Sequence, residues 1–379
     1  MATDAWGFSV VAQATAQRYR NVRLTLSAAR LAVFLGVVAW LLSGPTIALR
    51  NAVSSLTASP WLIVAGYVLV VYGLLWVVGL PFAILSALVV EKRFGLSTAS
   101  AAVWLRDEAK ATLFGLAFAV IGASVLYTLI RWSPTWWWLA AWAIGFAFQI
   151  AIGVVGPIVI APLFYRFTPL RDEAIARRLR SLAEANGVAV VGAFEMKASA
   201  KTRRSNAALA GFGRTRRIIV TDTLLESFTP DEVETVLAHE LAHQRNGDSW
   251  RGLALSAVVS FLGFGVVGLV FPPAAAALGF VSIADVAALP LLMVLGGAVS
   301  IPLAPVEHAL TRRWEGRADA FALEATGKRD AFASAMVKLH DRNLAIANPH
   351  WLLERMFYSH PSGRRRVERA REVPASKPY

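Results

Sequence analysis

The sequence predicts a mainly α-helical polytopic membrane protein, with about six spans and one smaller α+β domain outside the membrane. Of its 379 residues 56% are hydrophobic and only 17% are charged, and the mean hydropathy is +0.52. A chain this apolar is typical of membrane proteins. The sequence contains no cysteine, which excludes disulfides and thiolate metal ligands.

Hydropathy and charge divide the chain into five segments. In order they are a polar to amphipathic N-terminal segment (1–24), spans one to four (25–163), a soluble domain (164–250), spans five and six (251–308) and a charged C-terminal part (309–379). Gly79 and Pro81 interrupt the second span, where we expect a kink. In the soluble domain, residues 171–187 predict an amphipathic helix, and residues 188–197 and 217–220 predict strands.

The distribution of lysine and arginine predicts the orientation in the membrane. These residues gather before span one, between spans two and three, between spans four and five, and after span six. With six spans these segments lie on one side, which the positive-inside rule assigns to the cytoplasm. The net charge of +13 also suits contact with anionic lipid. The arginines flank apolar spans without interleaved aromatic residues, which disfavours a nucleic-acid partner.

One motif carries the chemistry. His239 and His243 enclose Glu240 in an H-E-x-x-H pattern, and residues four apart share a helix face, so both imidazoles can reach one metal ion. Zinc suits such ligands, and Glu240 can act as general base on an activated water. Thr229 and Glu232 form a predicted capping box with Pro230 at the first helical position. The pattern therefore predicts a zinc-binding helix; an ordinary amphipathic helix is the alternative.

Two histidines leave a third ligand to be found. Ser249 stands where a metzincin would place its third histidine, so we expect a distant carboxylate, as in gluzincins. Glu315 is the best candidate, and Asp319 follows one turn later, where it can fix the tautomer of a ligand histidine. The other candidates for this ligand are Glu307, His308 and Glu324.

Several stretches together resemble the type I CAAX prenyl proteases, which are integral-membrane zinc endopeptidases of peptidase family M48. The matching stretches are residues 91–97, 160–170, 205–207 with 211–213, the His239 helix, 312–321 and 358–361. The resemblance implies a helical membrane barrel around a chamber that the zinc domain closes on the cytoplasmic side. The family has seven spans, so we expect the first of them to be missing here. After His360 and Pro361 the chain has Ser362-Gly363 and three arginines instead of the family's second proline and apolar pair.

The resemblance also implies roles for individual residues. One zinc ion per chain would be bound by His239, His243 and Glu315, with Glu240 as the base. Asn206 and Ala207 would lie on the strand that pairs with the substrate. His360 would hold substrate or the oxyanion, and Arg366 would lie near the site. His340 and His350 receive only structural roles.

These observations predict a membrane-embedded zinc metalloendopeptidase whose substrate is a peptide or protein, and the resemblance implies one with a prenylated C-terminus. Three alternatives stay open from the residues. They are a broad membrane-protein quality-control protease without prenyl specificity, a lipid-active zinc hydrolase with the same site, and a non-enzymatic transporter or scaffold with a vestigial metal site. The third is disfavoured because the chain shows no internal repeat of the kind common in transporters.

Overall fold

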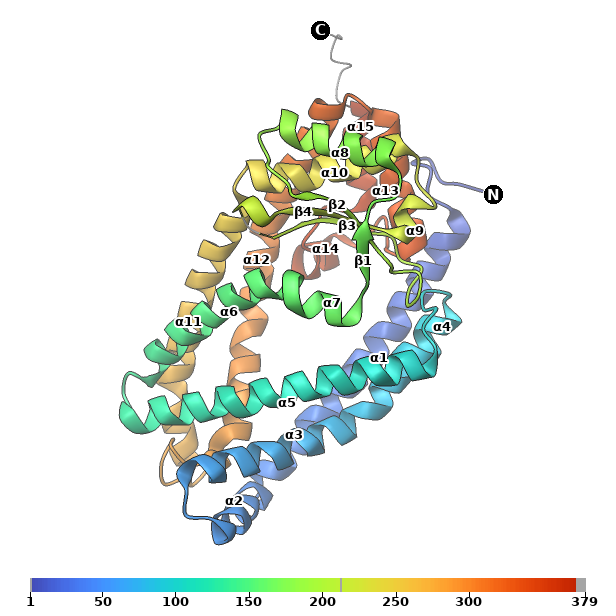
Figure 1. Ribbon diagram of the computed structural model, residues 1–379. Helices are drawn as coiled ribbons and strands as arrows, with labels where there is room; N and C mark the ends of the chain where they lie inside the picture. The colour runs from blue at the N-terminus through green and yellow to red at the C-terminus, as the bar shows by residue number, and fades with distance from the viewer. Residues whose placement is uncertain (1, 212, 373–379) are drawn as a thin grey trace.

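The computed structural model describes residues 2–211 and 213–372 and consists of a membrane part and a domain at one end of it (Figure 1). Phe212 of the 211–213 stretch and residues 373–379 of the C-terminal part lie outside the described residues. Within the described residues, six helices are long and apolar enough to span a membrane, which confirms the predicted number. They comprise α1 (Val10–Leu42), α3 (Pro60–Ile84) with its extension, α5 (Ala101–Trp132), α6 (Trp137–Val155) with its extension, α11 (Asp248–Ala277) and α12 (Leu289–Thr326).

The six span helices form a closed ring. Going around it, α1 contacts α3, α3 contacts α5, α5 contacts α6, α6 contacts α11, α11 contacts α12, and α12 returns to α1. Few side chains in the spans are buried, between 0% and 28% of each apolar window. A ring of helices with so little buried surface is a barrel rather than a solid bundle. The expected helical barrel is therefore confirmed (Figure 1).

A short helix, α2 (Pro45–Leu56), lies at the end of the barrel remote from the small domain, where it contacts α1 and α3 (Figure 1). Thr46 donates a hydrogen bond of 2.7 Å to the carbonyl of Ala287, and Arg50 forms an ion pair of 2.6 Å with Asp285. These contacts tie α2 to η4 (Val286–Ala288), the turn that precedes α12.

Prolines and π-helical turns shape two of the spans. The kink expected at Gly79 and Pro81 stays a prediction, since α3 continues through Pro81 to Ile84; a π-helical segment, η1 (Leu85–Val90), follows it and leads into α4 (Glu91–Arg93). A second π-helical segment, η2 (Gly156–Ile160), lies between α6 and α7 (Ala161–Phe164). Such segments accommodate the hydrogen bonds that proline interrupts.

Three predicted segment boundaries, 24/25, 250/251 and 308/309, fall inside α1, α11 and α12 respectively. Hydropathy changes along these helices where the chain leaves the apolar region, but the backbone hydrogen bonds continue. The N-terminal segment consequently joins span one in a single helix, and its start reaches into the domain, where Phe8 is fully buried.

The domain contains a four-stranded sheet covered by helices. The strands are β1 (Phe167–Pro169), β2 (Gly192–Met196), β3 (Ala207–Ala210) and β4 (Arg217–Thr221), in the order β1-β2-β4-β3. β2 and β4 are parallel, and the two edge strands are antiparallel to their neighbours. The predicted strands correspond to β2 and β4, and the predicted amphipathic helix to α8 (Glu173–Ala185).

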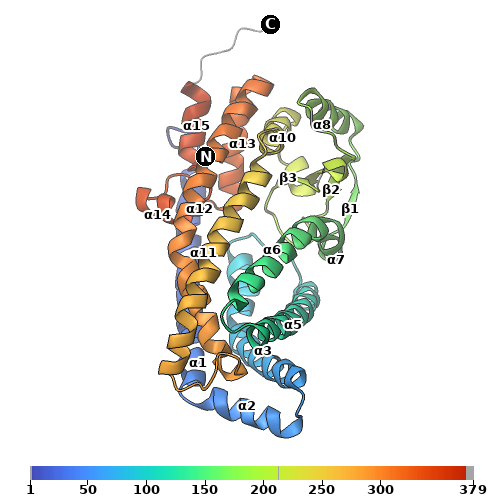
Figure 2. The same ribbon diagram turned by 90° about the vertical axis from the view of Figure 1, so that its left-hand side faces the viewer.

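One hydrophobic core joins the sheet to the helices around it. They are α8, α9 (Asp222–Leu225), α10 (Pro230–Arg245), the end of α12, α13 (Arg329–Asn343) and α15 (Gly363–Glu372). The short helix α14 (Trp351–Phe357) projects to the side of α12 (Figure 2). The site described below lies where α10, α12 and the segment before α15 meet.

Candidate active site

The helix α10 carries both histidines of the motif and is fixed at its start by the predicted capping box. The Thr229 side chain accepts from the backbone N–H of Glu232, whose carboxylate accepts from the N–H of Thr229 at 2.7 Å. Each of these two hydrogen bonds gives a partner to a backbone N–H that has none within the helix. Leu237 and Leu241 are fully buried and hold the opposite face of α10 in the core. The helix is thus rigidly placed, with one face toward α12.

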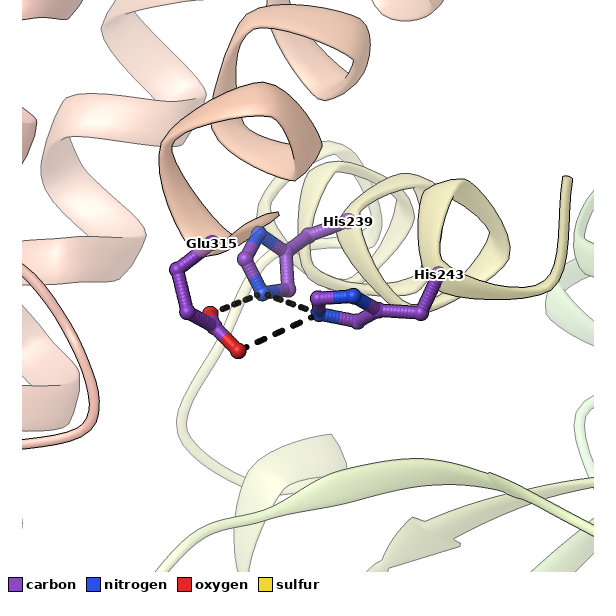
Figure 3. A group of neighbouring side chains, drawn as sticks. All are labelled: His239, His243 and Glu315. Atoms are coloured by element: carbon purple, nitrogen blue, oxygen red, sulfur yellow. Dashed lines mark hydrogen bonds and ion pairs between the residues drawn. The ribbon is translucent and has the colours of Figure 1, made fainter. Parts of the chain in front are cut away.

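His239, His243 and Glu315 converge on one point (Figure 3). Their potential ligand atoms all lie within 4.8 Å of one another. Nε2 of His239 is 3.1 Å from Glu315 Oε2, Nε2 of His243 is 3.4 Å from Oε1, and the two Nε2 atoms are 3.3 Å apart. α12 therefore brings Glu315 to α10 across more than seventy residues of sequence.

Each imidazole is oriented by a carboxylate at its other nitrogen. Asp319, fully buried, lies 2.9 Å from His239 Nδ1, and Asp248 lies 3.1 Å from His243 Nδ1. A carboxylate at this position holds the hydrogen on Nδ1 and leaves the lone pair on Nε2. Both lone pairs then face the centre of the cluster.

This donor set fits a divalent metal ion. Glu315 Oε2 is buried and makes no hydrogen bond, although His239 Nε2 is only 3.1 Å away. When both imidazoles are neutral, as metal binding requires, two lone pairs and a carboxylate face one another without a shared hydrogen and repel; a proton relieves this repulsion in part, and a metal cation at their centre removes it. Two imidazole nitrogens and one carboxylate are a ligand set that zinc accepts while it keeps one position open.

Asp248 was not among the predicted site residues. It is the first residue of α11 and follows Gly247, whose φ of 68° lies in the left-handed region. That turn reverses the chain so that the Asp248 carboxylate reaches back to His243. The available signal was a glycine directly after the helix and an acidic residue directly after the glycine.

Arg366 completes the support of His239. It is 8% exposed, and its Nε donates to both carboxylate oxygens of Asp319, at 3.1 and 2.9 Å. Asp319 thus accepts hydrogen bonds from a guanidinium and an imidazole together. Asp319 was predicted beside a ligand histidine and Arg366 near the site, and both residues lie there in the structure.

Burial and the charges of the site shift the pKa values of His239 and Glu240. Burial favours the neutral ring of His239, but the facing carboxylates of Asp319 and Glu315 outweigh burial and raise its pKa to about 9. Burial is also the main reason that the pKa of Glu240 is raised, with the Glu315 carboxylate adding to the effect. A raised pKa suits a carboxylate that must both take and return a proton.

A cleft of about 360 Å³ opens beside the cluster, and its lining includes Asn206, Ala207, Glu240, His360 and Arg366. His360 Nε2 lies 3.3 Å from Glu315 Oε2. Asn206 directly precedes β3, an edge strand of the sheet that contacts α10. An edge strand presents backbone N–H and C=O groups that an extended peptide can pair with. All the residues predicted for substrate binding therefore line one cleft.

The other candidates for the third ligand lie elsewhere. Among the described residues, the metal-type cluster contains neither Glu307, His308 nor Glu324. His340 is a helix residue whose Nδ1 donates to the carbonyl of Met336 at 2.8 Å. His350 caps the start of α14 and accepts from the N–H of Leu352.

A barrel of membrane helices joined to a domain with an H-E-x-x-H helix and a distant carboxylate defines an integral-membrane metallopeptidase. The chain belongs to peptidase family M48, whose family model matches residues 169–373. A second model, described as the CAAX prenyl protease N-terminal region with five membrane helices, matches residues 9–166. In that region the structure has four helices long enough to span, together with the shorter α2.

The relatives support the same assignment. An uncharacterized metalloprotease, YhfN of Bacillus subtilis, is 27% identical over 368 residues, which cover 94% of this chain and 85% of the relative. The CAAX prenyl protease 1 homolog of Arabidopsis thaliana is 29% identical over 304 residues, covering 78% and 69%. The crystal structure of S. mikatae Ste24p has a TM-score of 0.83 at 21% identity and covers 98% of this chain and 93% of that one, so the two share a fold.

Proposed function

We propose that this membrane metallopeptidase uses zinc, held by His239, His243 and Glu315, to cleave peptide bonds, with Glu240 as general base. The observation that carries the proposal is the pair of imidazole Nε2 atoms, 3.3 Å apart, that face a buried carboxylate oxygen without a hydrogen bond. When bound, zinc supplies the Lewis acidity that activates water and polarises a carbonyl. Glu240 takes the proton from the water and returns it to the leaving amine.

The surrounding residues have supporting roles in this proposal. Asp319 and Asp248 hold the two imidazoles with Nε2 inward, and Arg366 keeps the Asp319 carboxylate charged and in place. His360 lies beside Glu315 at the cleft, where its ring can donate a hydrogen bond to the oxygen on which charge develops. The free edge of β3, preceded by Asn206, binds the substrate backbone in an extended form.

We further propose that the site faces the cytoplasm and acts on protein C-termini that carry a lipid. The positive-inside distribution of lysine and arginine supports the orientation. The name of the Arabidopsis relative supports a prenylated substrate. A mainly apolar cavity of about 450 Å³, lined by residues of α5, α6, α11 and α12 such as Leu126, Trp137 and Val267, offers room for a lipid chain.

The test is cleavage of casein and of a peptide pair, prenylated and unlipidated, by the purified protein in detergent. Activity should disappear with a chelator, return with zinc, and be absent in Glu240→Gln although that variant still binds zinc. Glu184→Gln, an exposed substitution of the same kind on α8, serves as the matched control and should leave activity unchanged. Full activity of Glu240→Gln would overturn the mechanism. Equal cleavage of both peptides would overturn lipid specificity and favour a broad protease.

A further inference from the structure

A second cleft, of about 930 Å³, lies between α12 and α15 and next to α14, and it adjoins the catalytic cleft at Pro361 and Arg366. Six arginines line it: Arg312, Arg313, Arg317, Arg365, Arg366 and Arg369. Its carboxylates are those of Asp319 and Glu354, and both are engaged. Asp319 is paired with Arg366, and Glu354 accepts from the backbone N–H of Ser362 at 3.0 Å. The six arginines thus outnumber the two carboxylates of the lining threefold, although Arg317 also pairs, at 3.3 Å, with Asp248 outside the lining.

Four of these arginines are arranged as two facing pairs. Arg313 and Arg317 are four residues apart on α12, and Arg365 and Arg369 are four residues apart on α15. Like charges at this spacing repel on a helix surface. Arg365 is 3.5 Å from Glu354 with its side chain 64% exposed, and among the described residues no carboxylate lies within salt-bridge distance of Arg313. Arg317 and Arg365 each have a carboxylate partner, so the repulsion that an anion would relieve is greatest at Arg313.

The cleft lies close to where α12 leaves the membrane. Val306 is the last exposed large apolar residue of this helix, at 52% exposure, and Arg313 follows seven residues later. At 1.5 Å per residue this is about 10 Å along the helix, which reaches the headgroup layer of a bilayer. Arg313 therefore lies at the depth of the lipid phosphates.

α14 adds an apolar surface at the same place (Figure 2). It projects from the side of α12 and exposes four large apolar side chains, those of Trp351, Leu352, Met356 and Phe357, the last at 70%. Arg355 lies over the Trp351 ring at 5.2 Å. Exposed aromatic residues beside arginine are typical of the membrane–water interface.

We propose that the arginine cleft binds the phosphate headgroup of an anionic phospholipid, with α14 inserted at the interface beside it. Guanidinium groups bind phosphate through two parallel hydrogen bonds, and Arg313 and Arg365 are the exposed members best able to do so. Inorganic phosphate offers the same charge but no acyl chain to meet α14, and for that reason we assign the site to lipid. The proposal concerns binding alone and is independent of the proteolytic activity.

The test titrates phosphatidylglycerol or phosphatidylcholine into detergent micelles of the full-length protein and measures bound lipid by native mass spectrometry. Wild type should bind phosphatidylglycerol preferentially. An arginine near a lipid surface contributes about fivefold in affinity, so Arg313→Gln combined with Arg365→Gln should weaken binding about 30-fold. Replacing both by lysine should restore most of it. Arg171→Gln with Arg177→Gln removes the same charge at exposed positions at and near α8 and should change binding less than about twofold.

Three results would overturn the proposal. The first is equal affinity of wild type for the two lipids. The second is an equal loss of binding in the matched α8 double variant, which would indicate only general electrostatic attraction. The third comes from inorganic phosphate added to lipid-free micelles. If phosphate stabilises the wild-type protein against unfolding as much as phosphatidylglycerol does, and Arg313→Gln/Arg365→Gln loses this effect, the cleft binds a soluble phosphate compound.

Discussion

Asp319→Asn should destabilise the protein and loosen its metal site at the same time. The substitution keeps the shape of the side chain but removes the one carboxylate among the described residues with which Arg366 forms an ion pair. Both residues are buried, at 0% and 8% exposure. Breaking a buried ion pair by removing one partner costs about 3–5 kcal/mol. Because Arg366 also interacts with Glu315 and Glu240, we place the loss near 3 kcal/mol. The asparagine NH₂ must also face one of two donors, Arg366 or His239 Nδ1, which loosens the ring and should lower zinc affinity about 10–100-fold.

The assay compares the free energy of unfolding in mixed micelles with the zinc dissociation constant from chelator competition. Asp330→Asn, an exposed aspartate at the start of α13, is the matched control and should cost no more than about 0.5 kcal/mol. In a double-mutant cycle with Arg366→Gln the two losses should not add, since the second change removes the charge that the first has stranded. An unfolding free energy within about 0.5 kcal/mol of wild type, together with unchanged zinc affinity, would refute the reasoning.

Three further predictions follow from individual contacts. Asp248→Asn should weaken zinc binding about tenfold but lower the free energy of unfolding by less than about 1 kcal/mol, because its other partners, Arg251 and Arg317, are 49% exposed. A large loss of stability with normal zinc affinity in chelator competition would contradict this. Gly363→Ala should destabilise by about 1–3 kcal/mol because its Cβ would lie 2.7 Å from the His340 ring, whereas Gly296→Ala, with nothing within 4 Å, should cause no loss; equal unfolding midpoints for the two variants would show that the ring gives way. Burial lowers the pKa of His340 from 6.5 to about 4, so its neutral ring stabilises the fold above pH 6.5 and this stabilisation is lost as the pH falls toward 4. The free energy of unfolding should therefore fall by about 2 kcal/mol between pH 7 and pH 5. An unchanged dependence on pH in His340→Gln would contradict the assignment.

The helix with the two histidines was predictable because all of its signals are local. The capping residues Thr229 and Glu232 and the ligand spacing of His239 and His243 lie within fifteen residues of sequence, and the structure contains each of them as expected. The number of spans was predictable for the same reason, since hydropathy is a property of a short window. The ends of helices were harder to predict. α12 continues to Thr326 without a break, so span six and Glu315 belong to one helix.

The parts of the site that sequence did not reveal depend on how distant segments meet. The single-turn spacing of Glu315 and Asp319 predicted a shared face, and both reach His239. In contrast, Asp248 contacts His243 because of one backbone turn at Gly247 and the angle at which α11 leaves α10. Arg366 pairs with Asp319 from 47 residues away, on a helix whose position is set by the domain core. No local pattern encodes these tertiary contacts.

The buried charges of the site explain why a divalent cation is the ligand it favours. Arg366 neutralises Asp319, and Arg251 and Arg317 offset Asp248. With both imidazoles neutral, the carboxylates of Glu315 and Glu240 remain and together require two positive charges.

One proton can supply only half of this charge. The pKa values of His239 and Glu240 are both raised, which is the expected response of a site that carries excess negative charge. A monovalent cation would leave one carboxylate uncompensated, and calcium or magnesium prefers oxygen to the two imidazole nitrogens. Charge and donor type therefore favour a divalent transition metal, which supports the proposed zinc independently of the geometry on which the proposed function rests.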